Sequence, residues 1–151
     1  MATNAYVTPL MIRTFLQDRS AADNFLLDEV EMSTDLIDLA MVLVVDRYNT
    51  TTPILNEGYT EQDFPYKMEF LLGIAAFLLN SKGLNLARNT LPYTSTSGSA
   101  VDDSGNKSKL YLQLSKDYYG QFDERIKQIK QHKNVQDGFG FVSGPPRYGS
   151  F

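Results

Sequence analysis

Few of the residues that usually carry out chemistry are present in this sequence. It contains no cysteine and one histidine, His132. The lack of cysteine excludes disulfides, thiolate zinc sites and cysteine nucleophiles, and a transition-metal site would need carboxylates almost alone. His132 lies between Gln131 and Lys133. We expect it to be a solvated residue at the basic end of a long helix, where the helix dipole favours a cation.

The carboxylates do not follow a known catalytic or metal-binding motif. Asp102, Asp103 and Asn106 could offer oxygen ligands to calcium. Their segment lacks the alternating acids and the distant glutamate of an EF-hand loop, so we interpret it as a turn. Acid pairs such as Asp123 and Glu124 are adjacent in sequence, without a sign of a pocket that would shift a pKa. No glycine-rich phosphate loop, nucleophile elbow or zincin motif occurs. The sequence therefore predicts no enzyme, no cofactor and no metal.

The charged residues are divided between two parts of the chain. Residues 18–38 contain seven acids and one base, whereas residues 107–133 contain seven bases and three acids. One interpretation is that these parts face each other within one fold, or are simply solvated. The other is that the acidic surface of one copy meets the basic surface of the next, as heterologous contacts in a ring or filament require. On the second interpretation, Lys127 and Lys130 are candidate subunit contacts.

Length and composition indicate a single globular domain. The chain has 151 residues, of which 42% are hydrophobic and 21% charged, and its net charge of −4 argues against a phosphate-binding surface. The N-terminal residues show no secretion-signal pattern. The longest apolar run, residues 70–79, is about half of what a membrane span needs. It is expected to be a core helix in which Gly73 and two alanines let another helix approach, and no membrane partner is predicted.

Four segments have the apolar periodicity of a helix. Thr8 and Pro9 would cap and start the first, and Ser33 or Thr34 would cap the second. Residues 19–32 fit a loop, a helical turn or a short extended piece. The expected fold is mainly α, a four-helix bundle-like domain. Its helices are expected at residues 9–18, 34–48, 66–81 (or as far as 88) and 108–132.

Two further segments are expected to contact other molecules. Residues 90–106 are rich in Ser, Thr, Gly and Asp and fit a β-hairpin inserted between the last two helices, although a lone hairpin is marginal in water. Residues 134–151 combine glycines and prolines with aromatics. They fit an extended C-terminal arm that lies on a neighbour or folds back on the helical domain, residues 1–133. The candidate contact residues in these segments are Tyr93, Gly98, Val101, Phe139, Phe141, Tyr148 and Phe151.

The order of segments in this sequence resembles that of a family of virion proteins. A helix that ends near Arg88-Asn89 leads through a segment with Tyr93 and Gly98 into a final helix that begins with Lys109 and Tyr111, followed by a glycine-rich end. This order is similar to that of the small helical head-to-tail connector (adaptor) proteins of tailed bacteriophages. The resemblance covers roughly residues 35 to 151.

The resemblance implies a structural role in the virion. A connector subunit forms a homo-oligomeric ring, dodecameric by this resemblance, between the portal protein and the tail or neck proteins at the head-tail junction. The hairpin and the arm would touch neighbours, portal or tail. DNA would pass through the channel without specific binding, and the acidic balance of this chain would suit such sliding.

Two other functions remain open from the sequence. One is a small helical regulatory module that binds a peptide or another protein in a groove beside residues 36–45. The other is a tail-terminator or tail-completion protein, although rings of that kind are commonly built on β-rich folds. Mass measurement separates the first alternative from a connector, because a binding module stays a monomer or dimer at all concentrations.

Overall fold

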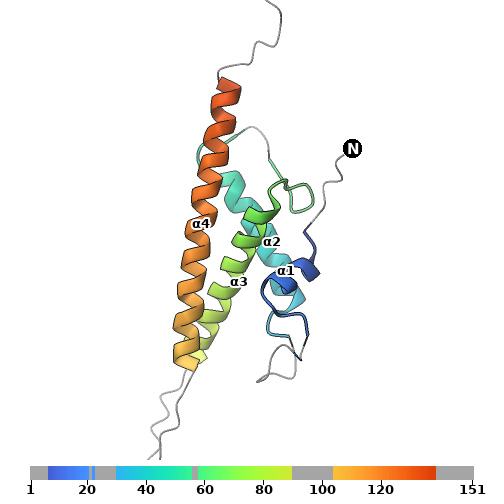
Figure 1. The fold of residues 1–151 in the computed structure, drawn as a ribbon, viewed down its shortest axis with the longest axis vertical. Coiled ribbons are helices and arrows are strands. Elements are labelled where there is room, and N and C mark those ends of the chain that lie inside the picture. The colour runs from blue at the N-terminus through green and yellow to red at the C-terminus, as the bar shows by residue number, and fades with distance from the viewer. Residues whose placement is uncertain (1–6, 21, 23–29, 56–57, 90–103, 139–151) are drawn as a thin grey trace, which may run out of the picture.

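The computed structural model describes residues 7–20, 22, 30–55, 58–89 and 104–138. They form four α-helices, α1 (Pro9–Phe15), α2 (Thr34–Thr50), α3 (Lys67–Asn89) and α4 (Ser104–Gly138). Figure 1 shows α3 and α4 side by side and running in opposite directions, with α2 crossing behind α3. The most extensive packing is between α3 and α4, and the short helix α1 lies against α2 and α3.

The predicted fold class is wrong in its β-hairpin. The described residues contain no strand, and the last part of the predicted hairpin, residues 104–106, belongs to the first turn of α4. Asp, Ser and Asn favour turns and helix starts for the same reason, because their side chains bond to nearby backbone groups. Residues 104–106, which the sequence pattern places in a turn, therefore start a helix instead. The rest of the hairpin, with Tyr93, Gly98 and Val101, lies outside the described residues.

The last helix is longer than the sequence pattern indicates. It was expected at residues 108–132 but spans 35 residues and ends at Gly138. The C-terminal arm was expected to start at residue 134, so its first five residues are helical instead. Its aromatic contact candidates, Phe139, Phe141, Tyr148 and Phe151, lie outside the described residues.

The two N-terminal helices begin where their capping residues predict. The Thr8 hydroxyl accepts a hydrogen bond from the Met11 N–H at 3.3 Å, and the Ser33 hydroxyl accepts one from the Leu36 N–H at 3.3 Å. Both satisfy a backbone donor that a helix start leaves unpaired. α1 ends earlier than expected because Gln17 takes a positive φ of 57°, which a right-handed helix does not allow.

The core lies where α2 crosses the α3–α4 pair. α3 can be approached closely because Gly73 has no side chain: a Cβ at this position would lie 2.5 Å from Val44 Cγ1 and 2.9 Å from Phe122 Cε2. The expectation that small residues of this helix admit a neighbouring helix is confirmed. The fully or almost fully buried side chains of this core include Ile12, Ile37, Met41, Val44, Tyr48, Phe70, Ile74, Leu78, Phe122 and Ile126.

Among the helices that the structure describes, α3 is both long and strongly apolar. Its length and composition alone would allow it to cross a membrane, a test that the central helix of a folded core also passes, and half of its most apolar window is buried against other residues. Residues 70–79, predicted as a core helix, include Phe70, Ile74 and Leu78, which are at most 1% exposed. The apolar character of α3 is therefore used for packing between α2 and α4.

Candidate interaction surface

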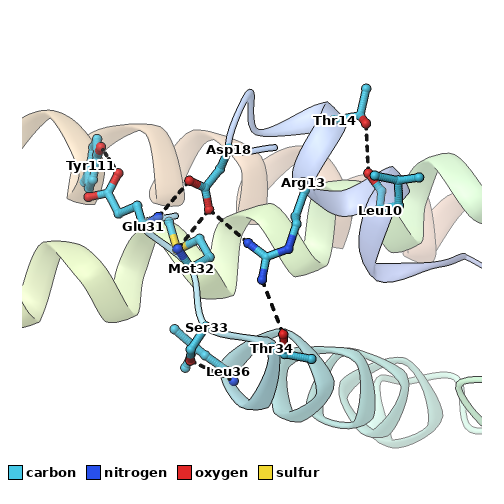
Figure 2. A network of polar contacts seen from close by, with 10 residues as sticks. All are labelled: Leu10, Arg13, Thr14, Asp18, Glu31, Met32, Ser33, Thr34, Leu36 and Tyr111. Atoms are coloured by element: carbon cyan, nitrogen blue, oxygen red, sulfur yellow. Dashed lines mark hydrogen bonds and ion pairs between the residues drawn. The ribbon is translucent and has the colours of Figure 1, made fainter. Parts of the chain in front are cut away.

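One buried carboxylate ties α1 to the chain that enters α2. Asp18 is 4% exposed, and it accepts hydrogen bonds from the backbone N–H of Glu31 at 2.7 Å and of Met32 at 2.8 Å. The Arg13 guanidinium donates to the same carboxylate at 3.3 Å and reaches the Thr34 hydroxyl at 3.4 Å. Figure 2 shows this network at the junction of α1 and α2. Asp18 thus has a structural role, since three donors converge on it.

The residue next to this junction connects it to α4. Glu31 accepts a hydrogen bond from the Tyr111 hydroxyl at 2.9 Å and pairs with the Lys107 ammonium at 3.2 Å. Burial lowers the pKa of Lys107, but the Glu31 carboxylate and the Tyr111 hydroxyl outweigh it, so the pKa is raised. Burial, together with the bond to Glu31, raises the pKa of Tyr111. The acidic and basic parts of the sequence therefore meet here within one chain.

This connection should make the fold sensitive to alkaline pH. A raised pKa means that the folded chain holds the proton more tightly than the unfolded chain, whose values lie near 10.0 for Tyr111 and 10.5 for Lys107. The stabilisation that these two groups contribute is complete below their unfolded-state pKa values. It is lost as the pH rises through their raised folded-state pKa values. We expect the Tyr111→Phe variant to lose less unfolding free energy than wild type between about pH 9 and pH 11. Urea titrations at both values test this, and an equal loss in the two proteins would contradict the role of Tyr111.

A second junction holds α2 against α4. The Arg47 guanidinium donates two hydrogen bonds to the Asp123 carboxylate, at 3.0 and 2.7 Å, and lies 4.8 Å from the centre of the Tyr119 ring. The bond to Asp123 raises the pKa of Arg47, and burial raises the pKa of Tyr119. Two-point binding of a carboxylate fixes orientation as well as distance. The edge of α4 that carries Asp123 therefore faces α2.

Lys130, predicted as a subunit contact, has another role. Its side chain is 1% exposed, and its ammonium donates to the backbone carbonyls of Tyr48 and Thr51 at the C-terminal end of α2. The same group lies 4.5 Å from the centre of the Tyr48 ring, and burial lowers its pKa. A cation at the end of a helix satisfies carbonyls that have no partner in the helix. The prediction of a surface contact at Lys130 is therefore corrected.

The remaining sequence-predicted residues have different outcomes. Lys127 is exposed on α4, one turn before Lys130, so it stays available for a contact. His132 is exposed as expected, but it lies inside α4 rather than at its end. Asn106 is in the first turn of α4, and Asp102 and Asp103 lie outside the described residues. Among the described residues, no group of three or more His, Cys, Asp or Glu could hold a metal ion.

Exposed apolar side chains occur on α1 and α2. Leu10 and Met11 of α1 are 66% and 37% exposed, and together with Phe15 and Leu71 they line a shallow, largely apolar groove of about 370 Å³ between α1 and α3. On α2, Leu39, Val42 and Leu43 are exposed together on the side opposite the core. Contiguous apolar surface of this kind is typical of an interaction site.

The chain was compared with protein families, curated proteins and solved structures. None of the three comparisons found a match. The interaction surface is therefore interpreted from its own residues. The sequence pattern could have identified Lys130, because it continues the buried spacing of Phe122 and Ile126 at four-residue intervals along α4. No sequence signal identifies Glu31 or Asp18 as the residues that join the helices.

Proposed function

We propose that this chain is a structural subunit of a bacteriophage head-to-tail connector ring, which joins the portal to the tail around the DNA exit channel. The resemblance of residues 35–151 to that family is the starting point. The observation that supports it is the shape of the chain. α4 has 35 residues and α3 has 23, which correspond to about 50 and 35 Å, and α4 extends past α2 at both ends in Figure 1.

The α3–α4 pair would be the rigid part of such a subunit. Where the two helices pack, Ser115 donates a buried hydrogen bond to the Ala76 carbonyl at 2.7 Å, and Ser108 donates one to the Gly83 carbonyl at 2.8 Å. A Cβ on Gly83 would lie 2.8 Å from Leu112, so the helices are in direct contact far from the core. A stiff rod that presents its ends and its exposed apolar side chains suits assembly, because neighbouring copies can cover what one chain leaves open.

Deletion of residues 139–151 tests the assembly role. These residues carry the aromatic arm predicted from the sequence, and all four helices remain in the shortened chain. We expect the helical circular dichroism of the variant to be nearly unchanged and its incorporation into phage particles to be lost. Quantitative immunoblotting of purified particles measures incorporation, and the wild-type chain produced from the same vector is the control. Full incorporation of the shortened chain would contradict a contact role for the arm.

A helical binding module is the second candidate, and one observation favours it. The groove between α1 and α3 is lined mostly by apolar side chains, as a groove that takes an amphipathic helix would be. It is not the groove predicted beside residues 36–45, because none of those residues line it. A monomeric or dimeric mass at every concentration, with and without portal protein, would favour this candidate over a ring subunit.

A further inference from the structure

The exposed side of α2 combines acidic and apolar side chains. Leu39 and Val42 are each 49% exposed and Leu43 is 40% exposed. Around them lie the exposed residues Asp35, Asp38 and Asp46, none of which forms an ion pair with a described residue. These six residues form what we name the acidic ridge, and they lie opposite the buried side of the helix. The one arginine of α2, Arg47, is already held by Asp123.

α4 carries a matching row of positive charges. Lys109, Lys116 and Lys127 are all exposed, and their spacings of seven and eleven residues place them on one side of the helix. None of the three forms an ion pair within the described part of the chain. We name this row the basic stripe. Two solvent-exposed charged surfaces of opposite sign thus exist on one chain.

The ridge and the stripe approach each other at the C-terminal end of α2. Asp123 of α4 holds Arg47 of α2, so the edge of α4 around Asp123 faces α2. Lys116 lies seven residues before Asp123 and Lys127 lies four residues after it, which places both on that edge. The basic stripe therefore runs along the edge of α4 that borders the C-terminal end of α2, and the acidic ridge ends there at Asp46.

Such a surface is self-complementary. A two-fold axis that lies in the contact plane and runs between the two strips places the acidic strip of each copy on the basic strip of the other, and both contacts form at once. The charges also match in spacing. Asp35 and Asp46 are eleven residues apart, and so are Lys116 and Lys127, about 16 Å along each helix. The aliphatic stems of the lysines would cover the exposed apolar side chains of the ridge.

We propose that the free chain forms a two-fold dimer in which the acidic ridge of each copy lies on the basic stripe of the other. This inference goes beyond the connector role and does not depend on it. A two-fold contact closes on itself and cannot propagate around a ring, so the dimer is a state of the chain before assembly.

Charge reversal of each half tests the dimer. One variant carries Asp38→Lys and Asp46→Lys, and a second carries Lys116→Glu and Lys127→Glu. All four positions are exposed, and circular dichroism checks that both variants fold. Sedimentation equilibrium of the full-length chain at low salt gives the dissociation constant. We expect the dissociation constant of each variant to rise about tenfold or more, because like charges then face each other.

An equimolar mixture of the two variants should form dimers again. Raising the salt concentration should weaken the wild-type dimer, since exposed charges are screened.

A matched control variant distinguishes an effect of the ridge and the stripe from an effect of net charge. The variant with Glu61→Lys and Asp137→Lys changes the net charge as the first variant does, at positions off the ridge and the stripe. It should dimerise like wild type. A monomeric wild type at all concentrations, equal weakening in the control, or a mixture without dimers would each overturn the proposal. Oligomers larger than dimers in the mixture would show that the contact is head-to-tail and that the two-fold arrangement is wrong. The connector role is judged separately, by incorporation into particles.

Discussion

Replacement of Lys130 by glutamate should unfold the chain or lower its free energy of unfolding by about 3–5 kcal/mol, because it leaves an uncompensated charge in a buried site. The carboxylate would lie against the carbonyl oxygens of Tyr48 and Thr51, which the Lys130 ammonium binds in the native chain. Because the site is 1% exposed, water cannot solvate the new charge. The end of α2 would separate from α4.

The control for this variant lies on the same helix. Lys127→Glu makes the same change of charge one turn earlier, at an exposed position. At high salt, where the proposed dimer contact is screened, it should alter the free energy of unfolding by less than about 0.5 kcal/mol. Lys130→Met keeps most of the apolar stem but removes the donors, and an intermediate loss of about 1–3 kcal/mol is expected. Urea denaturation followed by circular dichroism measures all three. Equal effects at positions 127 and 130 would show that Lys130 is not buried.

Alanine in place of Gly73 should lower the free energy of unfolding, whereas alanine in place of Gly120 should raise it. In α3, the new Cβ of Gly73→Ala would lie 2.5 Å from Val44 Cγ1 and 2.9 Å from Phe122 Cε2. Overpacking of a core costs about 1–3 kcal/mol, which exceeds the gain of about 1 kcal/mol that alanine brings to a helix. In α4, nothing lies within 4 Å of a Cβ on Gly120, so only the gain remains.

Thermal and urea unfolding of both glycine variants measure this difference. We expect Gly73→Ala to be less stable than wild type and Gly120→Ala to be more stable by about 0.5–1 kcal/mol. Stabilisation by Gly73→Ala would mean that α2 and α4 do not approach α3 as closely as the structure shows. Gly73→Ser is a further probe, because it adds an unpaired hydroxyl to the same contact and should be worse than alanine.

Local signals predicted the helices well and the ends of α4 poorly. Thr8 and Ser33 are short-range capping residues, and their effect depends only on neighbours in sequence. The start of α4 was not predicted because Ser104, Gly105 and Asn106, which form its first turn, are residue types that serve equally in turns and at helix starts. Its C-terminal end was not predicted because residues 134–138 are mostly polar and include a glycine. These five residues are nevertheless helical in the structure, although they are exposed.

Long-range roles could not be predicted from residue types. Residues 107–133 contain seven bases, and only the position of the end of α2 decides that Lys130 becomes buried. Likewise, Asp18 and Glu31 belong to one acidic stretch, yet one holds backbone N–H groups and the other holds Tyr111. The division of charge along the sequence was therefore informative about which surfaces meet, while the choice of partners required the fold.

The connector proposal predicts that this chain functions only together with copies of itself. Electron microscopy of the full-length protein, alone and after mixing with portal protein encoded by the same genome, tests that claim most directly. We expect closed rings of uniform diameter on the portal, with the long axis of each subunit visible in class averages. Particles of monomer or dimer mass in both samples, with portal rings left bare, would contradict it.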